Sequence, residues 1–486
     1  MRTSLFEART STMNEIIMEE TIAAIATAYG EGGIGIVRIS GPEAFAILSK
    51  VFQQTGSADI QVRRVTYGKV IDRETGNTID EALAIYMKAP ASYTGEDVVE
   101  LQCHGSVVSL RKTLSLVLRN GARLAEPGEF TKRAFLNGRI DLSQAEAVMD
   151  VVKAKTDRTF DVAISQLEGS LSGRINEIRV DLLDLLVNIT VNIDYPDEDI
   201  EEMTYEGLKA SLSSIGDDIE KLLSTTGTGR MIREGLKIAI IGRPNVGKSS
   251  LMNCLLKESR AIVTEIPGTT RDTIEEALTV RGIPVFLTDT AGIRQTGDVI
   301  EQIGIEKAKE AFNNADFIID IIDGSSPLSE EDRSILEYIG DRKALILLNK
   351  KDVGTVVIPT DIKDISPNSD IISTSLLTGE GVDEIEDKIE ELVYDGQIVQ
   401  QASIMVTNVR HEELLRKSKQ AINDALALAK RKEPLDIIEI DVRSAYDFLG
   451  ERSPERPLRM KFWMKFSRDS ASGNRRIYGK VFDGHI

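Results

Sequence analysis

The chain has 486 residues and a net charge of −19, from 59 Lys and Arg against 78 Asp and Glu. This length predicts roughly two to four domains, and the acidic balance excludes a polybasic nucleic-acid-binding protein, so any RNA contact must use a local patch. The two cysteines, Cys103 and Cys254, are far apart in the sequence, which disfavours a disulfide framework and favours a reducing compartment such as the cytoplasm.

Residues 1–17 are polar and lack the apolar centre of a signal peptide. We expect a disordered leader, and Met13 and Met18 both offer a later start. Further along, no apolar run approaches the roughly 18 residues of a transmembrane helix. A cytoplasmic protein without membrane association is therefore expected.

Residues 18–137 predict a compact α+β domain, with strands at 21–26, 36–39 and 98–102 and a hairpin turn at 72–77. Gly30, Gly32 and Gly35 formally match a dinucleotide-binding fingerprint. These glycines precede a predicted strand rather than opening a helix, which disfavours a cofactor loop. Cys103 and His104 are adjacent on a strand and should point to opposite faces, so a nucleophile–base pair is also disfavoured.

Helical periodicity dominates the segments on either side of the chain's centre. Between Leu142 and Ile193, apolar residues recur in steps of three and four from Ile164 onward, which predicts a long helix with a break near Gly169 or Gly173. A similar pattern runs from Leu414 to Ala429. Neither half needs a core of its own. The simplest interpretation is one helical domain, formed by residues 138–234 and 399–451, with a separate domain at 235–398 inserted into it.

The inserted segment contains a phosphate-binding loop of the form G-x4-G-K-S at residues 242–249, after the apolar run 238–241. Its glycines let backbone N–H groups turn toward phosphates, Lys248 can reach the terminal phosphates, and the Ser249 hydroxyl can bind Mg²⁺. Nucleotide contacts are expected at Asn245, Val246, Gly247, Lys248, Ser249 and Ser250.

The base is indicated by Asn349, Lys350 and Asp352, which follow the apolar run 344–348. Asp352 can accept hydrogen bonds from the N1–H and exocyclic amine of guanine, and the stem of Lys350 can cover the ring. The run 373–376 matches the loop that closes over guanine, with Ser375 as a contact. This combination predicts GTP as the nucleotide.

Two motifs between the phosphate loop and the base motif are typical of switch segments. Thr270 is expected to be a second Mg²⁺ ligand, Asp289 to hold Mg²⁺ indirectly, and Gly292 to sense the γ-phosphate. Further GTP contacts are expected at Thr264, Thr269, Thr290 and Ala291. Ile293 stands where many small GTPases have a glutamine that orients the attacking water, so another group must position the water and neutralise charge.

Taken together, the layout and motifs resemble one family, the tRNA modification GTPases called MnmE or TrmE, over about residues 21–451. Beyond the nucleotide motifs, the resemblance rests on the runs 32–42, 93–105 and 126–138. It implies a multidomain α/β fold, in which a Ras-like P-loop G domain is inserted in an α-helical domain and preceded by an α+β tetrahydrofolate-binding-like domain. It also implies a homodimer formed through the N-terminal domain.

The activity implied by this resemblance is GTP hydrolysis coupled to tRNA modification. With an MnmG-type flavoprotein, in a heterotetramer, such an enzyme adds an aminomethyl or carboxymethylaminomethyl group to C5 of the wobble uridine, U34. The one-carbon source would be 5,10-methylenetetrahydrofolate or a related tetrahydrofolate, and FAD and NADH would act only through the partner. By the same resemblance, the folate contacts would be Arg38, Glu100 and Arg139. Their chemistry suits this role, since arginine can bind a carboxylate and Glu100 can accept from the pterin amide and amine.

The resemblance further implies a K⁺ ion in place of the missing glutamine, bound when two G domains meet. Its ligands would be Asn245, Thr264, Ile266 and Thr269. Glu301 matches the water-orienting glutamate of the family, with a solvated carboxylate at a helix start as the alternative. Arg271 is the third catalytic candidate beside Asn245 and Glu301, although holding the switch loop together with Asp272 suits it better.

Residues 452–486 depart from the family pattern, which ends in a short helix and Cys-x-Gly-Lys. Here Gly479-Lys480 has no such cysteine, and the segment carries nine Lys or Arg against three Asp or Glu, a net charge of +6. This change to a basic composition predicts that the segment is translated in another reading frame from about Arg452. An RNA-binding tail is the alternative, because Lys461, Trp463 and Phe466 interleave basic and aromatic side chains.

A GTP-dependent RNA or ribosome assembly switch without covalent chemistry is the alternative function. It would share the central GTP motifs. It does not explain the three N-terminal runs.

Overall fold

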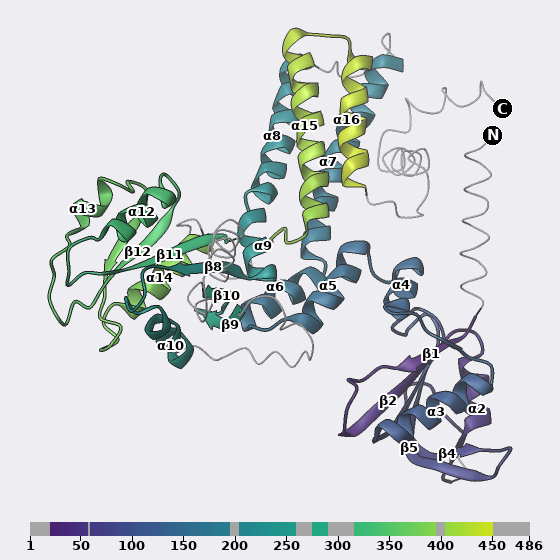
Figure 1. The fold of residues 1–486 in the computed structure, drawn as a ribbon. Helices are drawn as coiled ribbons and strands as arrows, with labels where there is room; N and C mark the ends of the chain where they lie inside the picture. The colour runs from purple at the N-terminus through teal and green to yellow at the C-terminus, as the bar shows by residue number, and fades with distance from the viewer. Residues whose placement is uncertain are drawn as a thin grey trace, which may run out of the picture. The chain divides into compact units, whose positions relative to one another are not determined.

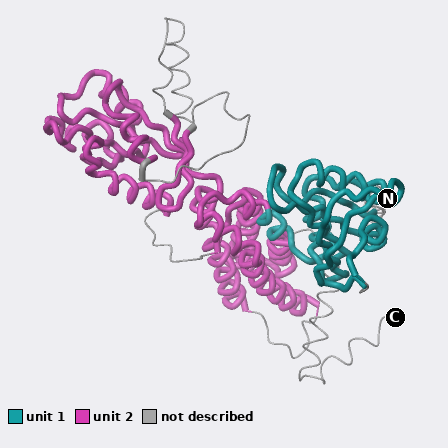
Figure 2. The backbone as a smooth tube through the Cα atoms, turned by 90° about the horizontal axis from the view of Figure 1, so that it is seen from below, with its two compact units in different colours: residues 1–148 teal, residues 149–486 magenta. Residues whose placement is uncertain are grey.

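The computed structural model describes residues 20–56, 59–194, 204–258, 275–289, 315–394 and 404–450. The chain divides into two compact units, residues 1–148 and 149–486 (Figure 2). In the described part of the chain, no helix combines the length and apolarity needed to cross a membrane.

The first unit is built on a seven-stranded sheet with the order β3-β4-β5-β6-β2-β1-β7. Its neighbouring strands are antiparallel, except that β1 and β7 are parallel. The strands are β1 (Ile22–Ile25), β2 (Gly32–Ser40), β3 (Phe52–Gln54), β4 (Thr66–Asp72), β5 (Asn77–Met87), β6 (Val98–Gly105) and β7 (Arg123–Leu124). The helices are α2 (Ala44–Val51), α3 (Val107–Arg119) and α4 (Glu129–Leu136).

Strand β2 shows why this sequence forms a sheet with one buried face. Val37 and Ile39 are fully buried at alternate positions, as the period of two along a strand requires, and they join the core beneath α2 and α3. The expected strands and the hairpin turn are present. Gly32 and Gly35 lie inside β2 rather than before it, which corrects the expectation for the glycine triplet. A Cβ at Gly35 would lie 2.5 Å from a methyl of Leu110, so the glycine permits α3 to pack closely on β2.

In the second unit, four long helices share one core and run side by side (Figure 1). They are α7 (Ser170–Asp194), α8 (Tyr205–Leu223), α15 (Val409–Arg431) and α16 (Leu435–Leu449). Leu182, Leu212, Ile422 and Val442, one from each helix, are buried in this core. Because α15 and α16 follow the inserted domain in sequence, the prediction that helices from both sides build one domain is confirmed.

Shorter helices connect this bundle to the rest of the chain: α5 (Leu142–Lys153), α6 (Asp157–Leu167) and α9 (Thr226–Glu234). The break expected near Gly169 or Gly173 lies at Gly169, which has φ 90° and separates α6 from α7. A second break, between α5 and α6, was not predicted. There the Thr156 side chain accepts a hydrogen bond from the Thr159 N–H and caps α6.

The inserted domain has a six-stranded sheet with the order β13-β12-β11-β8-β10-β9. Its strands are β8 (Leu236–Ile241), β9 (Glu275–Val280), β10 (Ile283–Asp289), β11 (Phe317–Asp323), β12 (Ala344–Asn349) and β13 (Asp370–Ser373). Neighbouring strands are parallel, except that β9 and β10 are antiparallel. The described helices are α10 (Lys248–Glu258), α12 (Glu330–Ile339), α13 (Pro359–Lys363) and α14 (Val382–Tyr394).

The sheet of the inserted domain is covered on both faces. Alternate residues of β12 enter two different cores, Leu345 and Leu347 in one and Ile346 and Leu348 in the other. This is why the predicted strand is a continuous apolar run rather than an alternating one. The carboxyl ends of the parallel strands then meet at one edge, where ligands of such sheets bind.

Candidate functional site

The phosphate-binding loop connects β8 to α10, and its backbone explains its glycines. Gly242 and Gly247 have φ of 130° and 120°. A Cβ at Gly242 would collide with the carbonyl oxygen of Ile321, and one at Gly247 with the side-chain amide of Asn349. Asn245 also has a positive φ, 63°, and is exposed. The loop can therefore form only with glycine at its two crowded positions.

Lys248 lies at the start of α10 and is 7% exposed. Its Nζ donates to the carbonyl oxygens of Gly242 and Arg243, at 2.7 and 2.6 Å. Val246 is buried, whereas Ser249 and Ser250 are exposed on the first turn of the helix. A helix N-terminus with a cation and hydroxyls beside it is suited to phosphate and to Mg²⁺.

Asn349 links this loop to the segments that would surround the base. Its Nδ2 donates to the Val246 carbonyl oxygen at 2.7 Å, and its Oδ1 accepts from the Leu376 N–H at 3.0 Å. Asp352 accepts a hydrogen bond from the Ser375 hydroxyl at 2.6 Å. The structure thus brings the phosphate loop, residues 242–249, together with the two predicted guanine-recognition motifs at 349–352 and 373–376.

Lys350 is held in an unusual backbone conformation, with φ 69°. Its Nζ pairs with the Asp323 carboxylate at 2.7 Å. Burial opposes ionisation of Asp323, but the hydrogen bonds from Lys350 and Ser325 outweigh it and lower the pKa of this carboxyl. Asp323, at the end of β11, is a contact that the sequence motifs alone did not identify.

Several predicted residues lie outside the described part of the chain: Thr264, Ile266, Thr269, Thr270, Arg271, Thr290, Ala291, Gly292 and Glu301. Asp289 ends β10, and its side chain is also outside what is described. The Mg²⁺ and K⁺ ligands among them, and the catalytic roles of Arg271 and Glu301, remain predictions. The basic tail from residue 452 lies outside the described residues as well.

A second cluster lies in the first unit, around Tyr93. Arg38 and Glu100 face each other across β2 and β6, and Arg38 Nε donates to Glu100 Oε1 at 2.8 Å. The guanidinium groups of Arg38 and Arg139 both lie 5.3 Å from the centroid of the Tyr93 ring. Arg38 also lies 5.6 Å from the Phe130 centroid. The three predicted folate contacts therefore gather around two aromatic rings that the sequence analysis did not single out.

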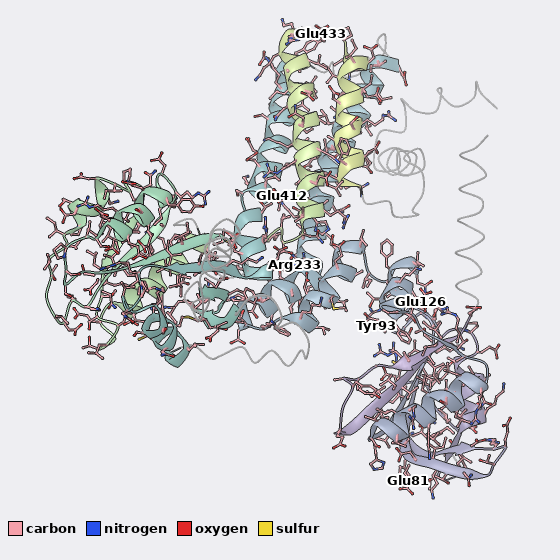
Figure 3. All side chains as sticks on the ribbon, in the orientation of Figure 1. Glu81, Tyr93, Glu126, Arg233, Glu412 and Glu433 are labelled. Carbon is pink, nitrogen blue, oxygen red and sulfur yellow. The ribbon has the colours of Figure 1, made fainter. Side chains whose placement is uncertain are left out.

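Arg38 and Glu100 are accessible to a ligand, with 26% and 15% of their side chains exposed. Tyr93 lies at the same end of the first unit as Glu126, away from Glu81 (Figure 3). Its hydroxyl shares a hydrogen bond with Thr131 Oγ1 at 2.9 Å, which connects the Tyr93 loop to α4. Tyr93 lies in the run 93–105 and Phe130 in the run 126–138. Aromatic residues within these runs were the sequence signal that could have identified the two rings as part of the site.

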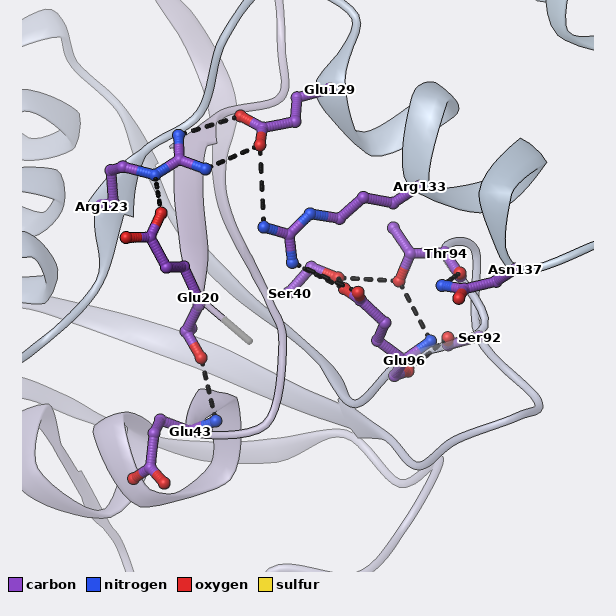
Figure 4. Close-up of polar contacts among 11 residues, drawn as sticks. Glu20, Ser40, Glu43, Ser92, Thr94, Glu96, Arg123, Glu129, Arg133 and Asn137 are labelled. Carbon is purple, nitrogen blue, oxygen red and sulfur yellow. Dashed lines mark hydrogen bonds and ion pairs between the residues drawn. The ribbon is translucent and has the colours of Figure 1, made fainter. Parts of the chain in front are cut away.

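A buried ionic network supports this cluster (Figure 4). Arg133, with no exposed side-chain surface, donates to both oxygens of Glu96 at 3.2 and 3.1 Å and lies 3.6 Å from Glu129. Arg123 adds two hydrogen bonds to Glu129, at 2.8 and 3.2 Å. Burial opposes ionisation of Glu129, but the bonds from Arg123 and the Glu126 N–H lower its pKa. The network fixes the loop carrying Tyr93 against α4.

Cys103 and His104 lie on opposite faces of β6, as expected. Cys103 is 3% exposed, and burial raises the pKa of its thiol to about 11. His104 is 70% exposed, and its Nδ1 lies 2.6 Å from Asp80 Oδ1. They cannot act as a nucleophile–base pair. Among the described residues, no cluster of His, Cys, Asp and Glu could hold a metal ion.

Known proteins match both units of the chain. Residues 21–139 match the family model for the GTP-binding protein TrmE N-terminus, and residues 142–453 match the MnmE helical domain. The chain is 52% identical over 439 residues to the tRNA modification GTPase MnmE of Alkaliphilus metalliredigens, covering 90% of this chain and 95% of that protein. It is 51% identical over 438 residues to the protein of the same description from Clostridioides difficile, with coverage of 90% and 95%.

Among solved structures, the G domain of the T. maritima FeoB iron transporter is 26% identical, covering 32% of this chain and 98% of that chain, with a TM-score of 0.25. The two family models agree with the relatives from Alkaliphilus metalliredigens and Clostridioides difficile, which are 52% and 51% identical over 90% of this chain. The chain belongs to the MnmE (TrmE) family of tRNA modification GTPases.

Proposed function

We propose that this GTPase acts with an MnmG-type flavoprotein to add an aminomethyl or carboxymethylaminomethyl group to C5 of the wobble uridine, U34, in tRNA. The observation that carries the proposal is the cluster in which Arg38 pairs with Glu100 at 2.8 Å and Arg38 and Arg139 both contact the Tyr93 ring. A guanidinium group can bind a carboxylate, and an aromatic ring can stack on a flat heterocycle. A glutamate can accept hydrogen bonds from the N–H groups of that heterocycle. Together they fit a reduced folate.

On the GTP side, Asp352 and Lys350 would recognise guanine, and Lys248 with the loop N–H groups would bind the phosphates. Asn245 and Ser249 are exposed beside Lys248, as a K⁺ ligand and a Mg²⁺ ligand need to be. With Thr270 for Mg²⁺ and Thr264, Ile266 and Thr269 for K⁺, these ions would neutralise charge developing on the phosphates. Glu301 would orient the attacking water, with Arg271 holding the switch segment.

The proposal includes a homodimer formed through the N-terminal domain, and FAD and NADH held by the flavoprotein. A 5,10-methylenetetrahydrofolate or related tetrahydrofolate would supply the one-carbon unit. A cytoplasmic location follows from tRNA as the substrate, and a chain with only two cysteines, Cys103 and Cys254, is consistent with it.

The test is nucleoside mass spectrometry of tRNA from cells that lack their own enzyme of this type and express this chain. We expect the C5-modified uridine to appear with the chain as written, or with a matched version ending in Cys-x-Gly-Lys if the altered tail impairs modification. Arg38→Gln should abolish the nucleoside while GTP hydrolysis by the purified protein persists. Lys248→Ala should abolish both.

Absence of the nucleoside with both chain endings would contradict the proposal. If the purified chain then also failed to bind tetrahydrofolate while hydrolysing GTP, the assembly-switch alternative would be favoured. A folate-binding chain whose modification depends on the Cys-x-Gly-Lys ending would place the defect in residues 452–486 and would leave the proposed site intact.

A further inference from the structure

Asp320 is a buried carboxylate that the GTP motifs do not explain. It lies in the middle of β11, between the fully buried Ile319 and Ile321, and is 1% exposed. In the described part of the chain, neither of its carboxylate oxygens makes a hydrogen bond of normal geometry, although the Ile321 N–H lies near enough to favour the ionised form. Such a group is expensive to bury in ionised form, so its presence between the apolar residues 317–319 and 321–322 of β11 points to a role at the site.

Its position in the sheet places it directly behind the phosphate-binding loop. Asp320 is in register with Ile241, the last residue of β8, and Gly242 of the loop follows at once. On its other side β12 presents the apolar Ile346. Among the described residues, the charged groups that act on Asp320 are Lys248, from α10, and Asp332, from α12.

The two neighbouring charges differ in what else they contact. Asp332 pairs with Arg243 of the loop at 2.9 Å, and it accepts from the Ser329 N–H and hydroxyl at the start of α12. Lys248 Nζ donates to the carbonyl oxygens of Gly242 and Arg243, within the loop where phosphates would bind. The ammonium of Lys248 is therefore a cation whose field Asp320 and a bound phosphate would share.

We propose that Asp320 weakens nucleotide binding and speeds the release of GDP, because its buried carboxylate partly cancels the positive field that Lys248 presents to the phosphates. Charges within a protein interior are poorly screened, so a carboxylate behind the loop acts on a phosphate in front of it. The effect is reciprocal: bound phosphate must disfavour ionisation of Asp320.

The protonation state of Asp320 gives the proposal a second signature. Burial, assisted by Asp332 and opposed by Lys248 and the Ile321 N–H, raises the pKa of Asp320 to about 7. Lowering the pH through this range removes the opposing negative charge. GDP release should therefore slow as the pH falls from about 8 to about 6, and a variant without an ionisable group at this position should lack that contribution.

The experiment measures the dissociation rate of a fluorescent GDP analogue from the full chain by stopped flow. Asp320→Asn keeps the shape of the side chain and removes its charge, and we expect release at pH 8 to slow by roughly three- to tenfold. The difference from the unchanged protein should shrink at pH 6. Asp341→Asn is the matched control, because Asp341 is exposed in the loop between α12 and β12 and its loss changes the net charge equally.

Equal or faster release from Asp320→Asn, in protein with an undiminished thermal midpoint, would overturn the proposal. Asp320→Leu provides the same comparison if the asparagine variant is unstable, since leucine leaves no polar group to satisfy. Faster release from the leucine variant would show that Asp320 supports the loop rather than opposing the phosphates.

Discussion

At the scale of single residues, base recognition depends on a carboxylate that the protein holds in place. Ser375 donates a hydrogen bond to one oxygen of Asp352 at 2.6 Å, and Asn349 connects the same region to the phosphate loop. The side chain is thus oriented before any base is bound, which limits the conformational entropy lost on binding.

Asp352→Asn should weaken GTP binding and favour xanthosine triphosphate, because an amide presents a donor where guanine offers its own donors. A site built to hydrogen-bond a ligand rejects the mismatched one by on the order of 100-fold or more. Competition binding with the two nucleotides measures the change. Asp364→Asn, at an exposed position, is the control, and unchanged guanine selectivity in Asp352→Asn would contradict the assignment.

Asp320 should also make stability depend on pH. Its folded-state pKa of about 7 lies above the ordinary value of 3.8, so the folded state binds the proton more tightly than the unfolded chain. Its contribution to stability is complete below pH 4 and is lost as the pH rises through 7. Asp320→Leu should therefore raise the urea midpoint of the G domain more at pH 8 than at pH 5. An equal shift at both values would argue against a raised pKa.

At the scale of elements, the first unit depends on a link between a loop and a helix. The loop 92–97 carries Tyr93, and α4 carries Phe130 and leads to Arg139. Arg133 of α4 pairs with Glu96 of the loop, and Asn137 donates to the Thr94 carbonyl oxygen at 2.7 Å. The aromatic cluster can keep its geometry only while this link holds.

Arg133→Met should destabilise the first unit by about 3–5 kcal/mol, because it leaves the largely buried Glu96 without its ionic partner and removes one of the two arginines that pair with Glu129. Hydrogen exchange of peptides from residues 20–148 measures the loss directly. Lys69→Met is the control: Lys69 and Glu81 are 46% and 51% exposed where they pair, and exposed pairs contribute about 0–1 kcal/mol. Similar effects for the two variants would show that the buried network has no special role.

At the scale of the whole molecule, the chain is a GTPase whose hydrolytic machinery we expect to be completed by a second copy. Asn245 is exposed on the phosphate loop, and Ile293 replaces the glutamine of many small GTPases. A monovalent cation held between two G domains would supply the missing positive charge.

Hydrolysis should accordingly be faster in K⁺ than in Na⁺ by tenfold or more, by analogy with the roughly 10³- to 10⁵-fold effect of an arginine finger. Turnover measured across protein concentrations in each salt tests both halves of the hypothesis. Asn245→Ala should remove the preference for K⁺. Equal turnover in the two salts, or a rate per molecule independent of concentration at dilutions that separate dimers, would reject it.

The sequence by itself determined the features that depend on contiguous residues. The strands and helices follow from local periodicity, and the phosphate loop and the Asn349–Asp352 motif are short runs whose chemistry lies within the run. The insertion of the G domain was also predictable, since two separated helical patterns flank the GTP motifs and neither needs a core of its own. The second helix break and the place of Gly32 and Gly35 inside β2 were missed, because local patterns locate element ends poorly.

The tertiary structure decided which distant side chains meet. Arg38 lies beside Glu100 because the register of β2 and β6 pairs these two positions. Tyr93 contacts Arg139 because α4 is fixed to the loop 92–97. Asp320 lies behind Gly242 because the register of β11 and β8 pairs Asp320 with Ile241. One residue of slip in either pairing would turn these side chains to the other face of the sheet. Local sequence sets the identity of each group, whereas its burial and its charged neighbours depend on strand register and packing.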